Sequence, residues 1–159
     1  ITFLTVLFCI IAFSKAVYSD MNQPLHRKKR VFLEGSIPPS FIAESIEKHS
    51  SQTRINSHGI YLEQVQEYTK NGQSLLSRRF SIDEVKAEDI LYQLREEIFS
   101  RFSLTCMHIY QSLGEVRVGA ISLFIFTSSE QENVAMDALS ELIRRFKAEV
   151  PLLIEDIFE

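Results

Sequence analysis

The stretch that decides the fold is MHIYQSLGEVRVGAISLFIFTSSEQENVAMDALSELIRRFKAEVPLLIEDIFE, residues 107–159. Two runs with strand composition, 105–111 and 120–127, are followed by a long amphipathic segment. The segment carries apolar side chains at helical spacing, at Val134, Ala138, Leu139, Leu142, Ile143 and Phe146. Period-two and period-3.6 patterns in this order predict two strands followed by a core-facing helix.

Upstream of this stretch, strand and helix patterns alternate. In chain order, the predicted elements are a strand over 31–34, a helix after Pro39, a loop over 49–58, a strand over 59–66, a turn at Asn71-Gly72, a returning strand over 75–80 and a helix over about 87–102. Strands that pair mostly through hairpins, with helices packed on one side, predict an α+β domain with a mostly antiparallel sheet.

Length and charge limit the class of protein. The chain has 159 residues, of which 45% are apolar and 24% charged, and this is enough for one domain with a real core but too short for two ordinary ones. The formal charge is −4, and the basic cluster at 26–30 is short. We therefore expect no nucleic-acid surface.

The first twenty residues allow two interpretations. Residues 1–13 are almost wholly apolar, with the length of a signal-peptide hydrophobic region rather than a membrane span. No positive residue precedes this run, and Met21 is followed by a polar, basic leader. We favour a start at Met21, with 1–20 as a mis-called upstream segment, 21–30 as a basic flank and 31–159 as the domain. A secretory or anchoring leader is the alternative.

The cysteines and histidines predict no metal site. Cys9 and Cys106 provide neither a disulfide framework nor paired ligand spacing, and Cys106 lies in an apolar run typical of a buried, inert thiol. His108 is two residues from Cys106, but the sequence shows no further ligands beside them. Four ligands are usual for structural zinc, so we expect neither a metal nor a cofactor.

The order of motifs in residues 107–159 resembles the C-terminal half of the large, catalytic subunit of molybdopterin synthase. The matching positions are Leu113-Gly114 and Gly119 at the turn between two strands, Ser128-Ser129 at a strand end, Ala135 and Ala138 at a helix start, then Lys147, Pro151 and Phe158. The resemblance covers 31–159, strongly over 107–159 and weakly over 67–89. It implies the α/β hammerhead type of α+β domain.

The resemblance also implies an activity and partners. Proteins of this family receive the C-terminal Gly-Gly tail of a ubiquitin-like small subunit, whose thiocarboxylate supplies sulfur. They insert two sulfurs into a cyclic pyranopterin monophosphate, which yields the dithiolene of molybdopterin. A cytoplasmic dimer of large subunits, with a small subunit at each end, is the expected assembly.

The family's chemical positions are only partly kept. Lys147 matches the first of two family lysines, and Ile154, followed by Glu155, stands at the second. Gln66 replaces an arginine, and Gln131-Glu132 replaces a His-Arg pair. These positions form the expected substrate-binding set, yet they have lost the cations that a phosphate and a carboxyl-type tail require. Free N–H groups near Gln131, or the side chains of Arg78, Arg79 and Arg117, are the candidates for compensation.

Three hypotheses follow. The first is an active, sulfur-transferring large subunit that depends on Lys147. The second is a non-catalytic member that keeps the scaffold for binding or regulation, since Gln66, Gln131, Glu132 and Ile154 do not carry the positive or ionisable groups of the family's site. The third is an unrelated secreted or membrane-tethered domain, which rests only on residues 1–13.

Overall fold

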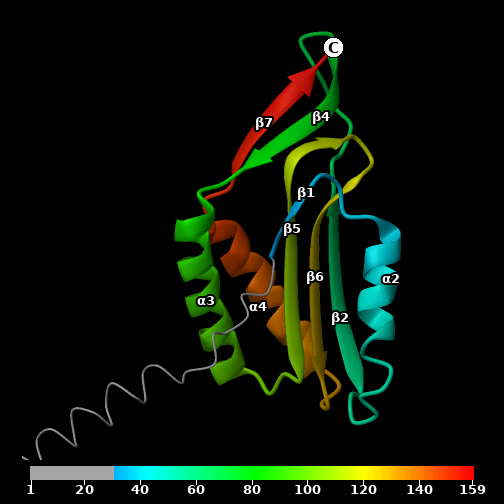
Figure 1. The fold of residues 1–159 in the computed structure, drawn as a ribbon, viewed down its shortest axis with the longest axis vertical. Helices are drawn as coiled ribbons and strands as arrows, with labels where there is room; N and C mark the ends of the chain where they lie inside the picture. Colours follow the sequence, from blue (N-terminus) through cyan, green and yellow to red (C-terminus); the bar gives the residue numbers. More distant parts are fainter. Residues whose placement is uncertain (1–30) are drawn as a thin grey trace, which may run out of the picture.

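A mostly antiparallel sheet and three helices make up residues 31–159, the part of the chain that this computed structural model describes (Figure 1). The elements are β1 (Phe32–Glu34), α2 (Pro39–Glu47), β2 (Ser57–Gln64), β3 (Thr69–Lys70), β4 (Gln73–Ser81), α3 (Glu84–Arg101), β5 (Cys106–Arg117), β6 (Ile121–Ser129), α4 (Val134–Glu149) and β7 (Leu153–Phe158). The predictions for 1–20 and 21–30 lie outside the described residues. No helix within 31–159 is long and apolar enough to cross a membrane.

The strand order is β2-β6-β5-β4-β3, with β1 beside β5 and β7 beside β4. Only the β1–β5 pair is parallel among the described strands. The centre is the predicted β5–β6 hairpin, in which Cys106 pairs with Ser128 and Ile109 with Ile125. The α+β prediction with a mostly antiparallel sheet is confirmed.

The β5 strand is longer than the predicted strand over 105–111, and Gly114, which was expected in a turn, lies inside it. The strand pairs first with β6 and then, from Gly114 to Arg117, with β4. Gly114 therefore lies inside the strand, with a φ of 73°, and a Cβ there would collide with the side chain of Glu34. The turn itself lies at Gly119, with a φ of 81°. A glycine is favoured at both places because positive φ strains residues with a side chain.

The helices lie on both faces of the sheet, which corrects the expectation of helices on one side. Leu123 and Ile125 of β6 face a core formed with α3 and α4. Phe124 and Phe126 point the other way, into a cluster with Ile37 and Ile42 beside α2. Strand side chains alternate between faces, so the continuous apolar run of β6 reflects burial on both sides.

The predicted helices form, with adjusted bounds. Helix α3 begins at Glu84, three residues before the predicted start, because Asp83 caps it by accepting a hydrogen bond from the Lys86 backbone N–H at 3.3 Å. Helix α4 carries the predicted apolar stripe, with Ala138, Leu142 and Phe146 buried.

The C-terminal residues form a strand that the sequence did not predict. Strand β7 pairs with β4, and the two extend together beyond the main sheet (Figure 1). Arg78 Nε lies 2.7 Å from an oxygen of Asp156, and Tyr68 donates a hydrogen bond to the same carboxylate. Exposed Leu153 and Ile154 break the alternation that would indicate a strand, so pairing and ion pairs, not periodicity, define β7.

Candidate functional site

Lys147 lies in the last turn of α4 and reaches the side chains of β2. Its Nζ is 2.5 Å from Oε2 of Glu63 and donates to the Tyr61 hydroxyl at 3.1 Å. The Tyr61 hydroxyl in turn donates to Glu63 Oε2 at 2.9 Å. We call Tyr61, Glu63 and Lys147 the lysine cluster; the sequence predicted only Lys147 from this set.

Strand alternation and a glycine bring these groups together. Residues 59, 61 and 63 point to one face of β2, and this is the face that α4 covers. A Cβ at Gly59 would lie 2.6 Å from Thr127 Oγ1 and 3.0 Å from the Ala135 carbonyl oxygen. The absence of a side chain at Gly59 therefore lets the first turn of α4 lie close against β2.

The lysine cluster holds Lys147 as an ammonium. The hydrogen bond to Glu63 raises the pKa of Lys147, the one to Tyr61 raises it further, and burial opposes both only in part. A lysine acts as a nucleophile only after losing its proton, which requires a lowered pKa. In this arrangement Lys147 is suited to binding an anion, and its amine is not free to attack.

Gln131 and Glu132 lie far from Lys147 within one chain. Both are exposed and precede α4, whereas Lys147 is in its last turn. Fifteen residues of helix correspond to roughly 22 Å. The backbone N–H of Gln131 already donates to Ser129 Oγ at 3.0 Å. This N–H, expected to compensate for lost cations, is therefore occupied.

The remaining predicted positions offer no positive charge. Gln66 is exposed just beyond β2. Ile154 is 55% exposed and sits opposite Phe80 in the β4–β7 pair. Oε2 of Glu155 lies 2.9 Å from Nη1 of Arg79, so Glu155 has its own partner. We see no cationic pocket formed by these three residues.

Two of the three arginines considered as replacements are bound to carboxylates. Arg78 is bound to Asp156, whose hydrogen bond raises the pKa of the guanidinium. Arg79 lies between Glu155 and Glu115, at 2.9 and 4.0 Å. Arg117 is exposed at the end of β5. Arg78 and Arg79 therefore stabilise the β4–β7 arm instead of forming an anion site.

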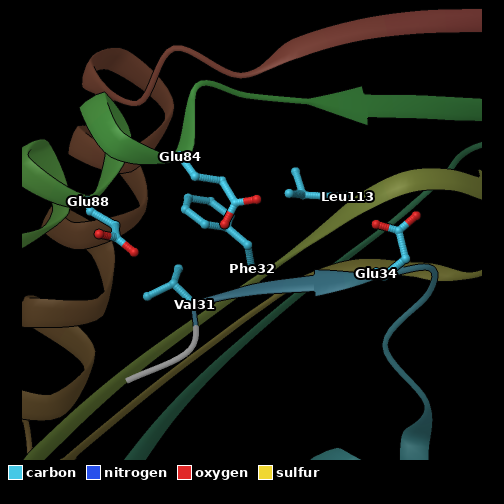
Figure 2. A pocket seen from close by; sticks show the side chains of 6 residues that line it. All are labelled: Val31, Phe32, Glu34, Glu84, Glu88 and Leu113. Carbon is cyan, nitrogen blue, oxygen red and sulfur yellow. The ribbon is translucent and has the colours of Figure 1, made fainter. Parts of the chain in front are cut away.

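A pocket between β1 and the start of α3 is acidic (Figure 2). Its lining consists of Val31, Phe32, Glu34, Glu84, Glu88 and Leu113. Figure 2 shows Glu84 and Glu88 extending from α3 and Glu34 from the end of β1. None of the six is basic, so a phosphate-bearing substrate would meet like charge. This pocket is not the expected substrate site.

A second group of chemical side chains lies on the opposite face of the sheet. His49, Cys106 and His108 place their potential ligand atoms within 4.8 Å of one another, and we call them the His–Cys cluster. Cys106 and His108 stand out in the sequence, whereas His49 lies in a segment that was predicted to be a loop. Nothing in the sequence pairs residue 49 with residue 106, because only the fold brings α2 onto this face.

Comparison with known proteins identifies the fold and a family. The MoaE protein family matches residues 40–149. Molybdopterin synthase from Staphylococcus aureus superposes with a TM-score of 0.71 at 23% identity, covering 84% of this chain and 94% of that one. A complex of subunits 1 and 2 of molybdopterin-converting factor from Helicobacter pylori 26695 contains a chain that superposes on this one with a TM-score of 0.69. The identity is 13%, and the match covers 80% of this chain and 84% of that one.

A further structure is similar over most of its length. The molybdopterin biosynthesis MoaE protein from Burkholderia ambifaria MC40-6 gives a TM-score of 0.64 at 12% identity, covering 81% of this chain and 89% of that one. The search of curated proteins found no match. At these identities the solved structures show only that the fold is shared, and the match to residues 40–149 is what shows that the chain belongs to the family.

Proposed function

Because the chain belongs to the MoaE protein family, we propose that it acts in molybdenum cofactor biosynthesis as a large subunit of molybdopterin synthase. The partner is a ubiquitin-like small subunit that ends in Gly-Gly. Two similar structures support this role, since one is a molybdopterin synthase and the other is a complex of two subunits of molybdopterin-converting factor. The cytoplasm is the compartment that the family resemblance favours.

The proposed reaction transfers sulfur from the thiocarboxylated tail of the small subunit to cyclic pyranopterin monophosphate. The position of Lys147 is the observation that carries this proposal. Its side chain is 49% exposed at the end of α4, so an incoming tail can reach Nζ. A charged amine next to a terminal carboxyl-type group forms a strong, charge-assisted hydrogen bond.

Binding of the tail competes with Glu63. The Glu63 carboxylate now occupies the ammonium at 2.5 Å, and a thiocarboxylate approaching Lys147 must displace it. Both partners are partly solvent-exposed, and exposed ion pairs are usually weak. The exchange therefore costs little. Glu63 also raises the Lys147 pKa, so the pair slows any step of sulfur transfer that needs a neutral amine.

We also propose a homodimer of large subunits. The family positions at Gln131 and Glu132 lie at the opposite end of α4 from Lys147, so one chain does not unite them. In the proposed dimer, a second copy places its own Gln131 and Glu132 beside Lys147 of the first. The expected site is then formed between the two copies. The pyranopterin substrate would then contact both copies.

The second candidate function is a non-catalytic family member that binds the small subunit. The Glu63–Lys147 pair favours this alternative, because it stabilises the ammonium. The exposed, apolar Ile154 favours it too, since this side chain supplies no amine where the family has its second lysine.

The test mixes the full chain with thiocarboxylated small subunit and cyclic pyranopterin monophosphate under anaerobic conditions, and follows dithiolene product. We expect product above the no-enzyme control, lost in Lys147→Ala and retained in Lys86→Ala. Lys86 is a matched control because it is an exposed lysine paired with Asp83, on a different helix.

Binding of the small subunit is measured in parallel. Bound small subunit with no product would support the non-catalytic candidate and overturn the catalytic one. No binding to any variant would overturn both. Product that persists in Lys147→Ala would show that sulfur transfer does not depend on Lys147.

A further inference from the structure

The His–Cys cluster joins two segments that are distant in the sequence. Cys106 and His108 are two residues apart on β5, so they share one face of the strand. His49 follows the end of α2, which covers that face. Its Nε2 lies 3.0 Å from the Cys106 sulfur, and all three potential ligand atoms lie within 4.8 Å of one another. Two imidazoles and one thiol thus converge on a single point.

The backbone fixes the orientation of His49. Its Nδ1 lies 2.6 Å from the carbonyl oxygen of Ser45. A carbonyl oxygen only accepts hydrogen bonds, so Nδ1 carries a proton, and in the neutral ring Nε2 then directs its lone pair toward Cys106. Histidine ligands in metal sites are typically held in this way, with the other ring nitrogen donating to a backbone carbonyl.

A serine supports the sulfur. The Ser128 hydroxyl lies 3.0 Å from the Cys106 sulfur and is fully buried. His58 Nδ1 lies 3.0 Å from the same hydroxyl and orients it from the neighbouring strand. A hydroxyl that donates to sulfur stabilises the thiolate, which is the form of cysteine that binds metals.

Packing limits the movement of these side chains. The Phe126 ring is completely buried, with its centre 4.8 Å from that of His49 and 6.1 Å from that of His108. His49 itself is only 9% exposed. Tetrahedral zinc separates neighbouring nitrogen and sulfur ligands by roughly 3.3–3.6 Å. This separation falls between the 3.0 Å contact and the 4.8 Å limit seen here, so small side-chain rotations suffice.

We propose that His49, Cys106 and His108 bind a transition-metal ion, with Zn²⁺ as the best match. Imidazole and thiolate ligands suit zinc and similar borderline-soft ions, whereas Mg²⁺ and Ca²⁺ prefer oxygen. Three protein ligands leave a fourth position for water or another small ligand, as in open zinc sites. The site lies on the face of the sheet opposite the lysine cluster, so this proposal does not depend on the proposed sulfur transfer.

The test titrates Co²⁺ and then Zn²⁺ into the reduced full chain in a Cys9→Ser background. The chain has only two cysteines, so any thiolate band then reports Cys106. We expect one equivalent of Co²⁺ to give a thiolate-to-metal charge-transfer band and the visible bands of four-coordinate cobalt. Zn²⁺ should displace it and slow the alkylation of Cys106.

Substitutions distinguish metal binding at these three residues from non-specific binding elsewhere on the chain. We expect His49→Ala, Cys106→Ser and His108→Ala each to weaken Zn²⁺ binding at least about tenfold. His26→Ala is the control and should leave the affinity within about twofold, because His26 is not among the three ligands. His108 is partly exposed, so its loss should not unfold the domain, and far-ultraviolet circular dichroism checks this.

Several outcomes would overturn the site. They are the absence of a charge-transfer band, unchanged Zn²⁺ affinity in Cys106→Ser, or an equal loss of affinity in the His26→Ala control. Fast alkylation of Cys106 that Zn²⁺ does not slow would indicate a metal-free Cys–His pair instead. A rise in melting temperature with Zn²⁺, absent in His108→Ala, would support the site by a second measurement.

Discussion

The lysine cluster and the His–Cys cluster lie on opposite faces of the same sheet and differ in the partners that their charged and polar groups have. Lys147 is half exposed and already bound to Glu63 and Tyr61. His49 is nearly buried, and its Nε2 faces a sulfur across 3.0 Å. A residue that matches a family motif is thus held as an ammonium, which suits the binding of an anion and not nucleophilic attack. The group with converging ligand atoms is one that no sequence motif indicated.

The largest expected effect comes from removing the aromatic ring beneath the His–Cys cluster. Phe126→Ala leaves a cavity at a fully buried position, so we expect the free energy of unfolding to fall by about 3–5 kcal/mol. Lys147→Ala should cost about 1 kcal/mol or less, because its ion pair is partly exposed. Urea denaturation measures both free energies, and similar losses would show that the two faces do not differ in their contribution to stability.

A smaller effect is expected from filling the space between β2 and α4. The new methyl group in Gly59→Ala would meet Thr127 Oγ1 and the Ala135 carbonyl oxygen. Overpacking of this kind costs about 1–3 kcal/mol. The change lies on the lysine-cluster face, so Zn²⁺ binding at the opposite face should be retained in the folded protein. Thermal unfolding with and without Zn²⁺ checks both expectations.

Glu63→Gln tests the charge match in the lysine cluster. The Glu63 hydrogen bond is the main cause of the raised Lys147 pKa, so its loss should lower that pKa and increase reactivity toward amine reagents at a given pH. Labelling of Lys147 followed by mass spectrometry measures this, with Lys86 as the internal control. Unchanged labelling would show that Glu63 does not control the ammonium.

The same substitution changes the pH dependence of stability. A raised pKa means that Lys147 stabilises the fold below its ordinary pKa of 10.5 and loses this contribution as pH rises through the higher folded value. Wild type should therefore lose stability above about pH 10.5 more steeply than Glu63→Gln, by up to about 1 kcal/mol. Urea midpoints across alkaline pH test this sign.

The smallest effect is expected at a predicted binding position that belongs to neither cluster. Glu155 pairs with Arg79, and their side chains are 67% and 51% exposed. Glu155→Gln should change the free energy of unfolding by less than about 0.5 kcal/mol. It should also leave both Zn²⁺ binding and labelling of Lys147 unchanged. A large loss would mean that the β4–β7 arm depends on this exposed pair.

Much of the fold was predictable because its patterns are local. The stripe of α4 and the apolar run of β6 identify a helix and a buried strand without knowledge of their neighbours. The extension of β5 and the existence of β7 were not predictable in this way. Each depends on pairing with β4, a contact that leaves no periodicity in residues 112–117 or 153–158.

The candidate site shows the same division. The family motif located Lys147, but its partners Glu63 and Tyr61 are found only when β2 is placed against α4. His49 lies 57 residues from Cys106, and the polar sequence around it indicated a loop. His49 is therefore a potential ligand beside Cys106 and His108 that the sequence alone does not reveal.

The sequence by itself determined the α+β class, the order of the main elements, the family resemblance and the loss of cations at Gln66, Glu132 and Ile154. Local periodicity and residue charge are properties of the chain, so they can be read along it. The tertiary structure alone decided that helices cover both faces, that Lys147 is held as an ammonium, and that His49 meets Cys106 and His108. These outcomes depend on distances between residues far apart in sequence, which are set only when the strands pair and the helices pack.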